Sequence, residues 1–116
     1  MNNETIPFEE SLFINQSGKY ILSIMNEDFK SSSWLLTNGI HKIGRLDDKE
    51  VILDDVTVSR NHGYITVDEN NLTITDEEST NGIFVNGELI KESKLASGTR
   101  IQIGKFFLIV SSVDES

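Results

Sequence analysis

The feature that most constrains the fold is a series of short apolar runs, separated by residues that favour tight turns. The runs occupy residues 20–25, 34–36, 41–43, 51–53, 64–67, 72–75, 83–85, 89–90, 100–103 and 106–110. Strands of this length and spacing are typical of an antiparallel β-sandwich, and no segment after residue 18 has helical periodicity over three turns. We therefore predict an all-β fold, an antiparallel β-sandwich, for residues 19–116.

Turn residues between consecutive runs predict which runs pair as hairpins. Asn-Gly pairs favour two-residue hairpin turns because both residues tolerate a positive φ. The predicted hairpins are residues 34–43 around Asn38-Gly39, residues 64–75 around residues 68–71, residues 83–90 around Asn86-Gly87 and residues 100–110 around Gly104-Lys105. The run at 51–53 has acidic neighbours and is predicted to be a short buried strand.

Residues 1–18 have no hydrophobic period and are predicted to form a flexible N-terminal arm. The arm nevertheless has more apolar residues than a plain linker needs, among them Ile6, Phe8, Leu12, Phe13 and Ile14. Such an arm is either a segment that docks on a surface or an ordinary tail, and composition favours the tail. We place the boundary between arm and domain after residue 18.

Composition excludes several classes of function. The chain has 116 residues, of which 19 are acidic and 10 basic, and its formal charge of −9 opposes binding to nucleic acid. It has no cysteine, and its acidic clusters lack the spacing of a calcium loop, so we predict no metal and no cofactor. No apolar run is long enough to span a membrane and no secretory signal is present. We expect one cytoplasmic domain with no membrane partner.

Three short segments carry the chemistry that a binding site needs. They are Gly44-Arg45, Ser59-Arg60-Asn61-His62 and Ser79-Thr80-Asn81-Gly82, each beside an apolar run. A guanidinium fork matches the oxygens of a phosphate, and a side-chain amide matches both the donor and the acceptor of a peptide bond. Distant acidic side chains are screened beyond about 8 Å at physiological salt. The segments therefore predict a site for a dianion carried on an extended peptide.

Simpler interpretations apply to each segment taken alone. Arg45 and Arg60 could be solvated surface charges, Ser59 could form a local turn, and Asn81-Gly82 could close a hairpin. The ordered combination in an acidic chain favours a binding site. A hydrolase built on Ser59 and His62 is rejected because no nucleophile elbow is present. We predict no catalytic residue and no enzyme activity.

The ordered set of Gly-Arg, Ser-x-x-His and Ser-Thr-Asn-Gly resembles the forkhead-associated (FHA) domain, over roughly residues 19–110. The resemblance implies a sandwich of about eleven strands that binds phosphothreonine peptides. It implies binding roles for Arg45, Ser59, Arg60, Thr80 and Asn81, and supporting roles for Gly44, His62 and Gly82. His62 corresponds to an internal brace of the binding loops. Glu78 departs from the pattern, because the family commonly has glycine there.

Residues 53–60 and 101–106 further resemble small bacterial FHA regulators of the oxoglutarate dehydrogenase inhibitor and glycogen accumulation regulator family. That resemblance implies an arm that carries a threonine phosphorylated by a Ser/Thr kinase, and Thr5 is the candidate. We expect the protein to be a monomer. It also implies that the unphosphorylated form binds 2-oxoglutarate-handling enzymes and that phosphorylation closes the protein on itself. The alternative hypothesis is a constitutive interaction or scaffold domain without phosphate dependence.

Overall fold

The computed structural model describes residues 19–26 and 32–113, and every regular element in this part is a strand. The strands are β2 (Tyr20–Ile24), β3 (Ser33–Leu36), β4 (Gly39–Gly44), β5 (Val51–Ile52), β6 (Gly63–Asp68), β7 (Asn71–Asp76), β8 (Ile83–Val85), β9 (Glu88–Ile90), β10 (Glu92–Leu95), β11 (Arg100–Ile103) and β12 (Phe106–Ser112). Within these residues there is no helix long and apolar enough to cross a membrane.

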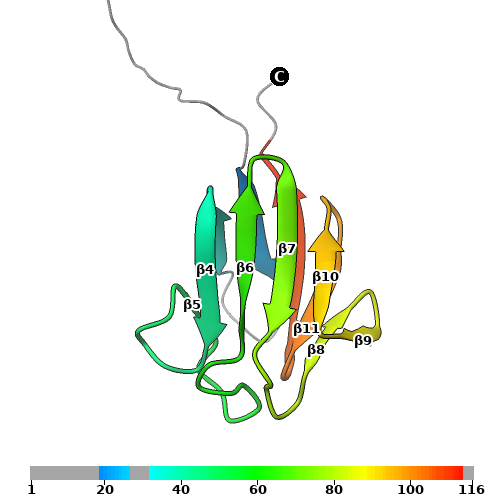
Figure 1. The fold of residues 1–116 in the computed structure, drawn as a ribbon. Coiled ribbons are helices and arrows are strands. Elements are labelled where there is room, and N and C mark those ends of the chain that lie inside the picture. The colour runs from blue at the N-terminus through cyan, green and yellow to red at the C-terminus, as the bar shows by residue number, and fades with distance from the viewer. Residues whose placement is uncertain (1–18, 27–31, 114–116) are drawn as a thin grey trace, which may run out of the picture.

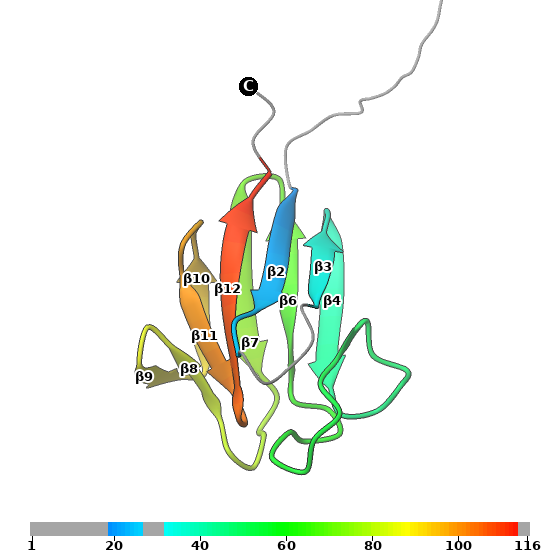
Figure 2. The ribbon, with the colours of Figure 1, turned by 180° about the vertical axis from the view of Figure 1, so that it is seen from behind.

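Two sheets pack face to face, as Figure 1 and Figure 2 show from opposite sides. The five-stranded sheet has the order β10-β7-β6-β4-β5, and the six-stranded sheet has the order β3-β2-β12-β11-β8-β9. All strand pairs are antiparallel except β4 with β5, which is parallel. The predicted β-sandwich of about eleven short strands is confirmed.

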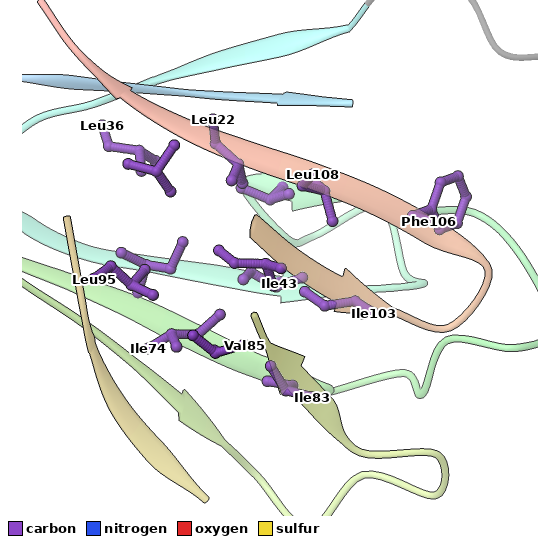
Figure 3. Packing of buried hydrophobic residues seen from close by; sticks show 14 of the residues in the cluster. Leu22, Leu36, Ile43, Ile74, Ile83, Val85, Leu95, Ile103, Phe106 and Leu108 are labelled. Atoms are coloured by element: carbon purple, nitrogen blue, oxygen red, sulfur yellow. The ribbon is translucent and has the colours of Figure 1, made fainter. Parts of the chain in front are cut away.

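The alternation of side chains along the strands builds the core between the sheets. In β6, and in β12 from Phe106 to Val110, every second residue is buried, as the pleat of a half-buried strand requires. Leu22 and Leu108 of the six-stranded sheet point toward Ile43 and Ile74 of the five-stranded sheet (Figure 3), and all four are at most 1% exposed. Each such side chain contributes about 1.5–3 kcal/mol on burial, so the apolar period stabilises the scaffold that carries the loops.

Three of the four predicted hairpins are confirmed, namely β6–β7, β8–β9 and β11–β12. In the turn between β8 and β9, Asn86 and Gly87 have φ values of 50° and 87°, as a two-residue hairpin turn requires. Gly104, between β11 and β12, also has a positive φ of 57°. The local turn chemistry was therefore sufficient to predict these pairings.

The predicted hairpin at residues 34–43 is wrong, because the two strands lie in different sheets. β3 pairs with β2, whereas β4 pairs with β6 and β5. Leu36 and Ile43 are both fully buried, and they reach the shared core from opposite sides. Asn38-Gly39 therefore carries the chain from one sheet to the other. The side-chain oxygen of Asn38 accepts a hydrogen bond from the Glu69 backbone N–H at 2.9 Å.

Two further features of the topology were not predicted. β10 pairs with β7 at the sheet edge, and its single buried residue, Leu95, leaves too little apolar pattern to mark a strand. The predicted strand at 51–53 exists as β5, but it runs parallel to β4. This parallel pairing returns the chain to the end of β4, so the residues between β4 and β5, which include Arg45, form a closed loop.

Candidate phosphopeptide-binding site

The predicted site residues lie on three connections at one end of the sandwich. The connections β4–β5, β5–β6 and β7–β8 all emerge at the lower end in Figure 1, whereas β2 begins and β12 ends at the opposite end. Arg45 and Asn81, which are 36 positions apart in sequence, thus lie in one loop cluster. Thr5 and the whole predicted arm lie outside the described residues.

Arg45 is held by two hydrogen bonds to the β5–β6 connection. Its backbone N–H donates to the Ser59 carbonyl and its Nε–H donates to the Val58 carbonyl, both at 3.0 Å. The half-buried guanidinium is therefore fixed through Nε, and its two terminal nitrogens have no hydrogen bond with a described residue. Among residues 19–26 and 32–113, no carboxylate forms an ion pair with Arg45 or Arg60. In a chain of charge −9, two such arginines favour an anion.

Ser59 and Thr80 are joined directly across the loops. The Thr80 backbone N–H donates to the Ser59 hydroxyl oxygen at 3.0 Å. The Ser59 hydroxyl donates no hydrogen bond to a described residue, so its proton can donate to a ligand. Thr80 is exposed, and so is Arg60, which directly follows Ser59. Ser59, Arg60 and Thr80 therefore offer hydroxyl and guanidinium donors. The hollow that Thr80 and Asn81 line is also lined by Asp76 and Glu78.

His62 is fully buried and links two of the loops from beneath. The Ser59 backbone N–H donates to Nδ1 at 3.0 Å, and Nε2 donates to the Gly82 carbonyl at 2.8 Å. Both bonds can form at once only with a neutral ring that carries its proton on Nε2. His62 thus fixes the β5–β6 connection relative to the β7–β8 connection, and it cannot reach a ligand from its buried position.

Asn81 is anchored to a part of the site that the sequence reasoning missed. Its side-chain Nδ2 donates to the Thr57 carbonyl at 2.9 Å, which leaves its side-chain oxygen and one N–H for a peptide backbone. The Thr57 hydroxyl donates to the Asp55 carboxylate at 2.6 Å and accepts a hydrogen bond from the Lys105 backbone N–H at 3.0 Å. The Asp-x-Thr pattern, typical of a side-chain turn, was the signal that could have identified Thr57.

Asp55 ties this loop to the turn between β11 and β12. Its carboxylate pairs with the Lys105 ammonium at 2.8 Å. That ammonium, together with the hydroxyl and backbone N–H of Thr57, lowers the pKa of Asp55 to about 2. The carboxylate is therefore ionised at neutral pH and holds the loop in place. The ammonium of Lys105 lies against this negative charge and partly compensates it.

The segment Ser79–Gly82 is held by hydrogen bonds to Asp76, a second residue that the sequence reasoning missed. The Ser79 hydroxyl donates to the Asp76 carboxylate and accepts a hydrogen bond from the Gly82 N–H at 2.9 Å. Glu78 has a φ of 54°, a conformation that favours glycine. The departure from the family pattern at Glu78 therefore places a strained residue immediately before the Ser-Thr-Asn-Gly segment.

Gly44 permits a close approach of two backbones at the centre of the cluster. A Cβ atom at this position would lie 2.1 Å from the Arg60 carbonyl oxygen. Gly82 has a φ of 82°, in the region that L-residues with side chains rarely adopt. At position 44 a side chain would therefore collide with the neighbouring backbone. At position 82 a side chain would strain the backbone conformation.

Comparison with known proteins identifies the domain family to which this chain belongs. The family model of the FHA domain matches residues 41–104, and the chain belongs to the FHA domain family. A solved structure from a structural and functional analysis of phosphothreonine-dependent FHA domain interactions has a TM-score of 0.77 and 32% identity, and covers 83% of this chain and 98% of that one. The structure of Mycobacterium tuberculosis EmbR with a low-affinity phosphopeptide has a TM-score of 0.77 and 28% identity, and covers 91% of this chain and 27% of EmbR.

Among individual proteins, the chain is similar to the glycogen accumulation regulator GarA of Mycobacterium tuberculosis. The two are 38% identical over 92 residues, which cover 79% of this chain and 57% of GarA. The oxoglutarate dehydrogenase inhibitor of Corynebacterium efficiens is 34% identical over 93 residues, which cover 80% of this chain and 66% of the inhibitor. The match thus spans less than two thirds of the length of each of these relatives.

Proposed function

We propose that this chain is a non-enzymatic signalling module that binds phosphothreonine peptides at its loop cluster. Arg45, Ser59, Arg60 and Thr80 hold the phosphate, and Asn81 bonds the peptide backbone beside it. The observation that carries the proposal is the Ser59 hydroxyl, which is held by the Thr80 N–H and donates to no described residue, together with Arg45, whose guanidinium is fixed through Nε. His62, Gly44 and Gly82 support the site from beneath.

The relatives support a regulatory role for the module. Two are named as a regulator of glycogen accumulation and an inhibitor of oxoglutarate dehydrogenase. We infer that this chain regulates a metabolic enzyme of the 2-oxoglutarate-handling class as a monomer, under the control of a Ser/Thr kinase. The domain responsible is residues 19–116, and the regulatory arm is residues 1–18.

We further infer that phosphorylated Thr5 occupies the chain's own site. The 13 residues from Thr5 to Gly18 span up to about 43 Å when extended. The seven residues of β12, which run the length of the sandwich, span about 23 Å. The arm is therefore long enough to reach the loop cluster from the end where β2 begins. Such a tether gives a local concentration near millimolar, so self-binding would exclude an external partner.

Arg45→Ala tests the binding site. We expect a phosphothreonine peptide of residues 1–10 to bind unphosphorylated protein, and Arg45→Ala to weaken binding by at least about 2–3 kcal/mol, because a charge-assisted fork is lost. Arg100→Ala is the matched control, since Arg100 is an exposed arginine on β11, away from the loop cluster. Calorimetric titration with phosphorylated and plain peptides measures both effects. Equal affinity for the two peptides would establish the phosphate-independent scaffold instead.

A further inference from the structure

A hollow of about 460 Å³ lies beside Thr80 and Asn81, on the side of the β8–β9 hairpin. Its lining combines residues of the β7–β8 connection with Leu89, Ile90 and Lys91, which lie at the end of β9 and directly after it (Figure 1). A cavity of about 150 Å³ can hold benzene, so the hollow has room for a long side chain. A peptide whose backbone bonds Asn81 passes the mouth of this hollow, and one of its side chains can enter.

One wall of the hollow is aliphatic. Leu89 is 66% exposed and leans over Gly82, because a Cβ atom on Gly82 would lie 2.5 Å from the Leu89 Cδ1 atom. Ile90 follows Leu89 and is half-buried. Gly82 directly follows Asn81, so this wall stands next to the amide that bonds the peptide. An apolar surface in that place favours the methylene stem of a bound side chain.

The rest of the rim carries an excess of negative charge. It contains the carboxylates of Asp76 and Glu78 and the ammonium of Lys91. None of these three groups forms an ion pair with a residue in 19–26 or 32–113. The Asp76 carboxylate is oriented by Ser79, whose hydroxyl and backbone N–H both donate to it. Two carboxylates against one ammonium favour a cation in the hollow.

Glu78 lies at the rim in a conformation that costs the loop free energy. Its φ of 54° is unfavourable by roughly 1–2 kcal/mol for a residue with a side chain. The exposed carboxylate has no ion pair within the described part of the chain that would offset this cost. Strained residues concentrate at ligand-binding sites. A contact with a bound ligand would account for a glutamate at a position where glycine would relieve the strain.

We propose that this hollow binds a lysine or arginine side chain of the phosphothreonine peptide, within two residues of the phosphothreonine. The methylene stem lies on Leu89 and the cationic end pairs with Glu78 and Asp76. Lysine and arginine suit the hollow because they join an apolar stem to a charged end. The separation is short because Thr80 both contacts the phosphate and lines the hollow. The proposal rests on the proposed function and adds a sequence preference to the same site.

Alanine-based peptides with a central phosphothreonine test this preference. At each of the two positions on either side, the peptide carries in turn lysine, norleucine, alanine or glutamate, and calorimetry measures its affinity for the wild-type protein. At one position we expect lysine to bind about tenfold more tightly than glutamate, because exposed charge contacts each change an affinity by up to about fivefold. Norleucine, which has the stem without the charge, should fall between the two.

Two substitutions separate the stem from the charge. Glu78→Gln should weaken the lysine peptide about threefold and leave the norleucine peptide unchanged. Leu89→Ala should weaken both by a similar factor and leave the alanine peptide unchanged. Glu88→Gln is the matched control, because Glu88 is an exposed glutamate of β9 that does not line the hollow, and its removal changes the net charge equally. It should alter none of the affinities.

The outcomes separate this inference from the proposed function. If phosphorylated and plain peptides bind equally, phosphate recognition itself is refuted. If binding requires the phosphate but lysine, norleucine and glutamate bind equally at every position, the phosphate site stands and the cationic subsite is refuted. A preference for glutamate would place Lys91 in contact with the peptide and overturn the proposal. Equal effects of Glu88→Gln and Glu78→Gln, or a Leu89→Ala variant that binds the alanine peptide just as weakly, would also overturn it.

Discussion

Replacing His62 by alanine should lower stability and peptide affinity together. The substitution removes two hydrogen bonds, each worth about 1 kcal/mol net, to Ser59 and Gly82. It also leaves the Ser59 N–H and the Gly82 carbonyl without their partner and opens a cavity at a fully buried position. Together these effects predict a loss of about 3–5 kcal/mol in the free energy of unfolding. Affinity should fall by at least about tenfold, because the two loops must then be ordered on binding.

His62→Gln separates the contributions of the two hydrogen bonds that His62 makes. The glutamine side-chain amide can still donate to the Gly82 carbonyl, but it offers no acceptor at the position of Nδ1, so it should recover about half of the lost stability. Urea denaturation measures the free energy of unfolding, and calorimetry with the phosphothreonine peptide measures affinity. A His62→Ala protein of unchanged stability that no longer bound the peptide would refute the brace, and would place the imidazole in contact with the ligand.

Three further predictions concern the framework of the site. The pKa of Asp55 is lowered to about 2 from an ordinary 3.8, so its ionised form stabilises the fold above about pH 4 and this contribution is lost as the pH falls toward 2. Asp55→Asn should therefore flatten the pH dependence of the unfolding free energy between pH 4 and pH 2, measured by denaturation at each pH, and an unchanged slope would contradict the pairing with Lys105. Gly44→Ala should destabilise the protein by about 2 kcal/mol or more, because its Cβ would collide with the Arg60 carbonyl; an unchanged melting temperature would show that the two backbones separate freely. Glu78→Gly should raise the melting temperature or leave it unchanged by relieving a φ of 54°, and a clear drop would mean that the glutamate side chain itself stabilises the loop.

Features that depend on neighbours in sequence could be predicted. The three confirmed hairpins close through adjacent turn residues, such as Asn86-Gly87, whose φ preferences act locally. The buried faces of β6 and β12 follow directly from their alternating residues. The candidate site residues were predicted from the order of three motifs, each placed at a strand boundary. This information is present in the sequence because it rests on intrinsic backbone preferences and on hydrophobic period.

Features that depend on which distant strands meet were decided by the tertiary structure. The pairing of β3 with β2 instead of β4 follows from the need of Leu36 and Ile43 to enter one core from opposite sheets. The parallel return of β5 and the edge position of β10 have no local signal. In the site, the hydrogen bonds of Arg45 to Val58 and of Asn81 to Thr57 join residues 13 and 24 positions apart. The sequence determined which polar groups the three segments contain, whereas packing of the two sheets brought those segments together at one end of the sandwich.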